Sequence, residues 1–142
     1  MNQLFIYGTL RDRDICEAVL SRAVAPDDMI AASAPDFAIY KVADVHYPCL
    51  LPADGQLAVG ALLTGLSDED LALLDQFEGV NYSRKPIGIL VDGKEIETQY
   101  YQPNEMLRTD GAWSLAQWQK QGKADFLGRD FHKNGVRVPP HA

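Results

Sequence analysis

The sequence predicts an α+β fold in one domain, with strands that form a closed or nearly closed mixed β-barrel. Most apolar segments are short and rich in β-prone residues, and only two or three segments show helical spacing. The regular alternation of strands and helices that a doubly wound fold requires is missing. A length of 142 residues fits one domain. We place that domain at residues 1–128, followed by a C-terminal tail at residues 129–142.

The N-terminal part predicts a buried strand, a turn and a helix. Residues 4–7 are apolar and β-prone, and Gly8 ends this segment. Apolar side chains then recur at helical spacing between residues 12 and 22. The first helix is therefore expected to begin close after the turn.

The middle of the chain predicts further strands. Residues 29–34 and 37–42 are two candidates on either side of a Pro-Asp dipeptide. Residues 47–52 are extended, but two prolines confine this segment to a sheet edge or a loop. Residues 56–64 form a strong strand candidate, in which Gly60 marks a bulge or a close approach of another segment.

A second helix follows with capping signals at both ends. Ser67 stands at the N-cap position with Asp70 three residues later, and Gly79 is expected to end the helix.

The remaining chain predicts a hairpin and a last helix. Strands at residues 85–91 and 94–101 flank Asp92-Gly93, which is a strong signal for a two-residue hairpin turn. The last helix is expected at residues 112–126, and the chain from Gly135 onward is expected to fray.

The composition argues against several classes of function. Thirteen basic and twenty acidic side chains give a net charge of −7, which opposes binding to the phosphates of nucleic acid. No apolar run approaches the roughly 18 residues that cross a bilayer, so no membrane partner is expected. The N-terminus lacks the features of a signal peptide, which predicts a cytoplasmic protein.

Residues 116–142 hold five basic and two acidic side chains, and we expect a solvated tail rather than an end docked on the acidic body or on a partner.

Neither the cysteines nor the histidines predict a metal site or a nucleophile. Cys16 and Cys49 are too few for a disulfide framework, and no histidine has a metal-ligand spacing. His46 and Cys49 would lie on opposite faces of a strand, because three is an odd step in a period of two. Cys16 is expected to pack as a small apolar residue, and Cys49, which follows a proline, is expected to be within reach of reagents.

A first candidate site is the turn formed by Tyr7, Gly8, Thr9 and Leu10. A strand runs into this turn and a helix follows it, so successive N–H groups can point at one anion. Gly8 permits a positive φ and a close approach of a ligand to the backbone. The structural alternative, a plain turn after a strand, is the commoner use of a single glycine.

The second candidate site is the end of the second helix. Leu71, Leu74 and Glu78 share one helix face, so a carboxylate stands on the apolar side. It also lies beside the negative end of the helix dipole. Burial and the dipole both favour the neutral acid and raise its pKa, a common property of catalytic acids. Two structural alternatives stay open, a solvated side chain at a frayed helix end or an ion pair with Arg84. Asp75, one step off this face, is expected to be a solvated acid.

These segments resemble the γ-glutamylcyclotransferase family, which includes γ-glutamylamine cyclotransferases and AIG2-like proteins. The family opens with an apolar strand that runs into Tyr-Gly-Ser/Thr-Leu, as residues 5–10 do here. A Tyr-Pro-x-Leu-like segment matches residues 47–50, and a Leu-Asp-x-x-Glu-Gly helix end matches residues 74–79. The remaining matches are single residues, namely Tyr82 and Arg84 of an x-x-Tyr-x-Arg tail and Tyr101 at the end of a later strand.

The resemblance covers about residues 3–103 and implies a small mixed β-barrel with flanking helices. It implies a pocket where the N-terminal turn meets the end of the second helix. The implied reaction cyclises the γ-glutamyl group of a small γ-glutamyl amine or peptide to 5-oxoproline and releases the amine. No metal or organic cofactor is implied.

The resemblance also assigns roles to residues. Glu78 would carry protons as general acid and base. Backbone N–H groups of the turn would hold the substrate carboxylate or the developing oxyanion. The implied substrate-binding residues are Tyr7, Gly8, Thr9, Leu10, Tyr82 and Tyr101.

Two other classes of function are compatible with this scaffold, because a fold does not fix a function. One is a small-metabolite-binding domain without catalysis, and the other is an amide or ester hydrolase that uses the same pocket. The presence of Glu78 in its motif favours the cyclotransferase over binding alone. Free γ-glutamyl amino acids, γ-glutamyl-lysine amides and glutathione-like peptides are all compatible substrates.

Overall fold

A computed structural model describes residues 2–43, 48–104 and 108–123, together with the backbone of residues 131–132 and 135–136. The strands are β1 (Asn2–Ile6), β2 (Met29–Val42), β3 (Pro48–Leu66), β4 (Tyr82–Val91), β5 (Lys94–Pro103), β6 (Thr109–Ala112), β7 (Phe131–His132) and β8 (Gly135–Val136). The helices are α1 (Arg13–Leu20), α2 (Asp68–Glu78) and α3 (Leu115–Gln121), with 3-10 turns η1 (Thr9–Arg11) and η2 (Pro26–Asp28). The chain therefore has the α+β architecture with flanking helices that the sequence predicts.

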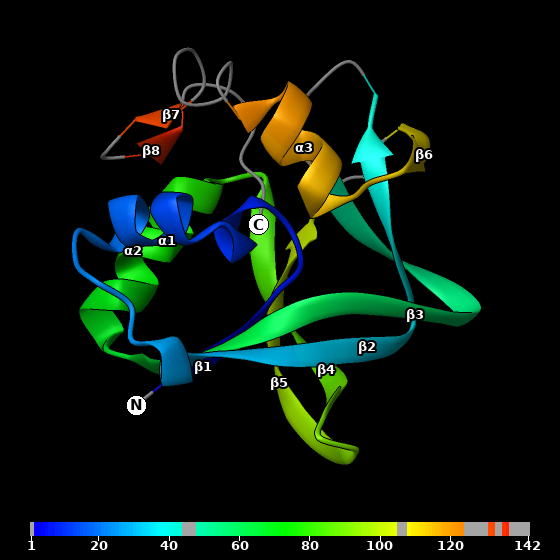
Figure 1. Cartoon of the computed structure of the whole chain (residues 1–142), viewed down its shortest axis with the longest axis horizontal. Coiled ribbons are helices and arrows are strands. Elements are labelled where there is room, and N and C mark those ends of the chain that lie inside the picture. The colour runs from blue at the N-terminus through cyan, green and yellow to red at the C-terminus, as the bar shows by residue number, and fades with distance from the viewer. Residues whose placement is uncertain (1, 44–47, 105–107, 124–130, 133–134, 137–142) are drawn as a thin grey trace.

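One antiparallel sheet of six strands organises the fold. Its order is β1-β3-β2-β4-β5, and β6 pairs with β2 off this path. The long strands β2 and β3 run together through the centre of Figure 1, while α1 and α2 lie against each other at one end of this ribbon. Thr98 on β5 donates a hydrogen bond to the carbonyl of Gln3 on β1 at 3.2 Å, and these two strands contact each other. The two ends of the sheet thus approach each other, as a nearly closed barrel requires.

β2 is one continuous strand where the sequence predicts two. It pairs with β3 along its length, and the register shifts between Pro35 and Phe37. At this shift Asp36 has φ of 63°, and its carboxylate accepts a hydrogen bond from the Gly55 N–H at 3.0 Å. The Pro-Asp dipeptide therefore forms a bulge in a paired strand instead of ending it.

β3 likewise joins the two segments predicted around residues 47–52 and 56–64. Its prolines pair only with β2, because β1 pairs with β3 at residues 61–66. The prolines therefore stand on an edge, as predicted. Tyr47 lies outside the described residues.

Gly60 allows β1 to lie against β3, which confirms the predicted close approach. A Cβ atom at this position would lie 2.4 Å from the carbonyl oxygen of Ile6 and 2.7 Å from the ring of Phe5. No side chain larger than hydrogen fits there without moving the backbone of β1.

Two other local predictions are confirmed. The first helix, α1, begins at Arg13, close after the N-terminal turn, and the side chain of its N-cap residue Asp12 accepts from the N–H groups of Asp14 and Ile15. Asp92 and Gly93 have φ of 51° and 75°, as a type I′ hairpin turn between β4 and β5 requires.

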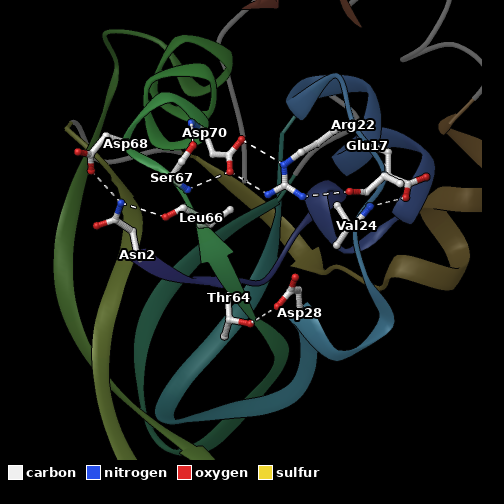
Figure 2. Close-up of polar contacts among 11 residues, drawn as sticks. Asn2, Glu17, Arg22, Val24, Asp28, Thr64, Leu66, Ser67, Asp68 and Asp70 are labelled. Atoms are coloured by element: carbon white, nitrogen blue, oxygen red, sulfur yellow. Dashed lines mark hydrogen bonds and ion pairs between the residues drawn. The ribbon is translucent and has the colours of Figure 1, made fainter.

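The N-terminal end of α2 is fixed by polar contacts (Figure 2). Ser67 and Asp70 form the predicted capping box. Arg22, which follows α1, donates to both carboxylate oxygens of Asp70 at 2.8 and 3.3 Å. This contact joins the end of α1 to the start of α2, and Glu78 lies at the opposite end of α2.

The C-terminal part differs from the prediction. α3 begins at Leu115 with Ser114 as its N-cap, whereas residues 109–112 pair with β2 as β6. Of the predicted helix, only Ala112 belongs to β6, and the Trp113 N–H donates to the Ile39 carbonyl of β2, so the helix begins three residues later than predicted. Residue 126, where the predicted helix ends, lies outside the described residues, as do residues 137–142 of the tail. Residues 135–136 are not frayed but pair with β7 and lie against α2.

Part of the basic C-terminal end docks on the acidic body. The Nζ atom of Lys123 lies 3.0 Å from an Asp12 carboxylate oxygen and 2.8 Å from one of Asp14. The expected solvated end is therefore wrong at this residue, because two carboxylates at the start of α1 bind it. In the part of the chain that the structure describes, no helix has the length and apolar character needed to span a membrane.

Candidate functional site

Glu78 is the last residue of α2 and is fully buried. Its helix face packs into the core, where both Leu74 and Glu78 are 0% exposed. Gly79 follows with φ of 82°, and its N–H donates to the carbonyl of Asp75 at 2.8 Å, so the helix ends there as predicted. The alternative of a solvated side chain at a frayed helix end is wrong.

The carboxyl group of Glu78 has no counter-charge within the described residues. Two other buried acids, Asp12 and Asp70, accept hydrogen bonds and pair with cations. In contrast, neither oxygen of Glu78 has a hydrogen-bond partner among the residues described. Burial first, and then the negative charge of Asp75, raise the pKa of Glu78 well above its ordinary value of 4.5. Glu78 therefore holds its proton more strongly than a carboxyl group on the surface does.

Arg84 pairs with Asp75 and not with Glu78. Its Nε atom lies 3.0 Å from one carboxylate oxygen of Asp75, and a terminal nitrogen donates to the other at 3.2 Å. The hydroxyl of Tyr101 also donates to Asp75, at 2.6 Å. Asp75 therefore joins α2 to β4 and β5, where the sequence predicts only a solvated acid. The alternative of an ion pair between Glu78 and Arg84 is wrong.

A polar cavity of about 460 Å³ lies at this end of α2. Its lining comes from the helix end, β4 and β5, and consists of Asp75, Gly79, Tyr82, Ser83, Arg84, Gln99 and Tyr101. Gly79 lines the cavity, whereas the Glu78 side chain is 0% exposed and is not among the lining residues. Tyr82 and Tyr101 are thus brought to the end of α2.

Tyr7 connects the N-terminal turn to the same place. Its buried hydroxyl donates to the carbonyl of Tyr101 at 3.0 Å. Burial, followed by the negative charge of Glu78, raises the pKa of Tyr7. Tyr7, Glu78, Tyr82 and Tyr101, which are distant in the sequence, therefore gather in one region.

The other residues of the N-terminal turn lie deeper and do not line the cavity. Thr9 and Leu10, in η1, are 0% exposed. Gly8 has φ of −117°, so this turn does not use the positive φ that glycine permits. The hydroxyl oxygen of Thr9 is buried and has no hydrogen-bond partner within the described part of the chain. The Thr9 hydroxyl of this turn and the Glu78 carboxyl group are therefore both buried, and neither has a hydrogen-bond partner among the described residues.

Both cysteines are free and buried. Burial raises the pKa of Cys16 to about 12 and that of Cys49 to about 11. Cys16 packs as predicted, but the expected accessibility of Cys49 is wrong, because it packs with Val42. His46 lies outside the described residues, and among those described no three His, Cys, Asp or Glu side chains gather as metal ligands.

Relatives and solved structures share this fold. Residues 4–120 match the family model described as gamma-glutamyl cyclotransferase, AIG2-like. AIG2-like protein D of Arabidopsis thaliana is 28% identical over 132 residues, covering 89% of this chain and 85% of that protein. AIG2-like protein C of the same organism is 27% identical over 128 residues, covering 87% and 73%.

Two solved structures superimpose on most of the chain. A solution structure of an Arabidopsis thaliana protein has a TM-score of 0.68 and 24% identity, covering 89% of this chain and 86% of that one. A gamma-glutamyl cyclotransferase has a TM-score of 0.62 and 18% identity, covering 78% and 69%. These structures show the shared fold, and the family match spans most of the sequence. The chain belongs to the gamma-glutamyl cyclotransferase, AIG2-like family.

Proposed function

We propose that the protein cyclises the γ-glutamyl group of a small γ-glutamyl amine or peptide to 5-oxoproline, with Glu78 as general acid and base. The observation that carries this proposal is the fully buried carboxyl group of Glu78, which has no partner among the described residues. Burying such a group costs free energy, and acids with strongly raised pKa values are typical of functional sites.

The substrate supplies its own nucleophile in this reaction. The α-amine attacks the γ-carbonyl carbon, a five-membered lactam forms, and the bond from that carbon to the leaving nitrogen breaks. Intramolecular attack has a high effective molarity when the reacting atoms are held together. The protein therefore has to hold the bent conformer and to move protons.

Two protons pass from the α-nitrogen to the leaving nitrogen. Glu78, as the carboxylate, takes the first from the α-ammonium group, which frees the lone pair for attack. The resulting acid donates this proton to the leaving nitrogen as the carbon–nitrogen bond breaks. Glu78 then takes the second proton from the lactam nitrogen and passes it to the released amine. A carboxyl group with a raised pKa suits both directions of transfer near neutral pH.

The N-terminal turn and the tyrosines bind the substrate. Backbone N–H groups of Gly8, Thr9 and Leu10 hold its carboxylate or the developing oxyanion. The buried hydroxyl of Thr9 supports this assignment, since it has no partner in the described residues. The hydrogen bond from Tyr7 to the Tyr101 carbonyl supports it too, because it ties the turn to the wall of the cavity.

Substrate enters through the polar cavity beside Gly79. The Glu78 carboxyl group is 0% exposed, so a side chain of the wall has to move before a substrate touches it. Tyr82 and Tyr101 line this cavity together with Gly79, the residue after Glu78, which suits them to orient the glutamyl group.

The test is incubation with γ-glutamyl amino acids, a γ-glutamyl-lysine amide and glutathione, with detection of products by mass spectrometry. Heat-denatured protein serves as the control for spontaneous cyclisation. The proposal predicts 5-oxoproline and the free amine in equal amounts from at least one compound. Release of glutamate would instead indicate a hydrolase. A rise of the Tm with a γ-glutamyl compound that yields no product would indicate a binding domain.

A further inference from the structure

A second cavity, whose lining does not include Glu78, combines one cation with an apolar wall. It has a volume of about 480 Å³ and lies between η1, the β2–β3 ribbon and the start of α3. Arg11 is the only ionisable residue among those that line it, and the wall includes Leu57, Val59 and Trp113. Its volume is within the range of small-molecule sites, roughly 300–1,000 Å³.

Arg11 differs from the other arginines that the structure describes in this region. Arg13, Arg22 and Arg84 each pair with a carboxylate. The guanidinium group of Arg11 is half-buried and has neither an ion pair nor a hydrogen bond among the described residues. Burial lowers the pKa of Arg11, and no acidic neighbour opposes that effect. An unpaired, partly desolvated cation is unexpected in a chain with a net charge of −7.

The apolar wall is also unusual for a protein surface. Leu57 and Val59 are 55% and 56% exposed, and they are two of the three large apolar side chains that are exposed in the described part of the chain. They are two residues apart on β3, so their side chains project from the same face of the strand. Both line the cavity with Arg11. Exposed apolar side chains that gather at a concave surface mark a binding site more often than scattered ones do.

We propose that this cavity binds a small amphipathic carboxylate. Its carboxylate pairs with Arg11, and its apolar body lies against Leu57, Val59 and Trp113. A single guanidinium group matches one carboxylate, whereas the net negative charge of the protein disfavours ligands that carry several negative charges. The site does not depend on the proposed reaction at Glu78.

Decanoate is a suitable probe, with decyltrimethylammonium as a control of opposite charge and similar chain length. Binding is followed through the fluorescence of the tryptophans, since Trp113 lines the cavity. We expect saturable binding of decanoate and at least tenfold weaker binding of decyltrimethylammonium. Arg11→Gln should weaken decanoate binding by about 10- to 100-fold, as expected for the loss of a hydrogen-bonded charge. Lys85→Gln, at an exposed position on β4, removes the same charge elsewhere and should leave binding unchanged.

Val59→Glu keeps the test decisive if Arg11→Gln does not fold, because it places an acid at an exposed position of the wall. It should also weaken decanoate binding at least tenfold. Glu78→Gln should bind decanoate as the unmodified protein does. Absence of saturable decanoate binding would overturn the proposal. So would equal affinity for the two probes, or unchanged decanoate affinity in both cavity variants.

Discussion

Replacing Glu78 by glutamine should make the protein more stable at neutral pH. The carboxyl group is fully buried, and its pKa in the folded protein is raised well above 4.5. Between pH 4.5 and the raised pKa, the folded state binds a proton that the unfolded state has released. Stability therefore falls as pH rises through this range. Glutamine has nearly the same shape and does not titrate, so the variant avoids this loss.

The size of the effect follows from linkage. A difference of one between the folded and unfolded pKa values corresponds to about 1.4 kcal/mol. At pH 7 the loss cannot exceed about 3.4 kcal/mol, which is the free energy of protonating a carboxyl group whose pKa is 4.5. We expect the stability advantage of Glu78→Gln to grow by more than about 1 kcal/mol between pH 4.5 and pH 7. The burial of an amide instead of an acid adds a contribution that does not depend on pH.

Urea denaturation followed by tryptophan fluorescence at a series of pH values measures this difference. Glu97→Gln is the matched control, because Glu97 is an exposed glutamate on β5. Its stability difference from the unmodified protein should stay nearly constant over the same pH range. A difference for Glu78→Gln that also stays constant within about 0.5 kcal/mol would refute the argument that burial holds this acid neutral.

Three further substitutions test the fold and the site. Gly60→Ala should lower the free energy of unfolding by about 1–3 kcal/mol, because the added Cβ would lie 2.4 Å from the Ile6 carbonyl oxygen; a variant as stable as the original in urea would contradict this contact. Asp75→Asn keeps an acceptor for Tyr101 but loses the charge that pairs with the part-exposed Arg84. Its cost in urea should be about 0.5–1 kcal/mol, and a larger loss would mean that Asp75 carries more of the packing than its contacts indicate. Cys49→Ala should leave the rate of 5-oxoproline formation unchanged, and abolished turnover would instead indicate a thiol nucleophile.

Local chemistry explains the parts of the fold that the sequence predicts well. The capping box of Ser67 and Asp70 and the Asp92-Gly93 turn each depend on a few neighbouring residues. The close approach at Gly60 is indicated by the residue type alone, although its partner strand β1 is distant in sequence. The burial of Glu78 follows from its spacing on an apolar helix face, which is also local.

Long-range pairing explains what the sequence does not predict. The Pro-Asp dipeptide in β2 has the composition of a turn, but pairing with β3 on both sides keeps the strand continuous. Residues 109–112 join β2 as a strand because of contacts about seventy residues away in sequence. Tertiary contacts override local preference in both cases.

In the candidate site, too, some features follow from local residues and others from contacts between distant segments. Asp75, Arg84 and Tyr101 belong to motifs that resemble the family. No local pattern indicates that the Asp75 carboxylate accepts hydrogen bonds from both Arg84 and Tyr101. Their association needs the end of α2 to lie against β4 and β5. The sequence also does not predict that Arg11 lacks a carboxylate partner, because this is known only when the positions of all its neighbours are known.

Loss of the Glu78 carboxyl group should abolish most of the cyclisation, because Glu78 is the proposed proton carrier. The rate of 5-oxoproline formation is compared for the unmodified protein and Glu78→Gln, using the γ-glutamyl compound that reacts fastest and mass detection of the product. Far-UV circular dichroism and the urea midpoint establish that the variant is folded. We predict a rate at least about 100-fold lower in Glu78→Gln, as is typical when a general base is lost, and an unchanged rate in Glu97→Gln. Equal rates for the unmodified protein and Glu78→Gln would contradict this role of Glu78.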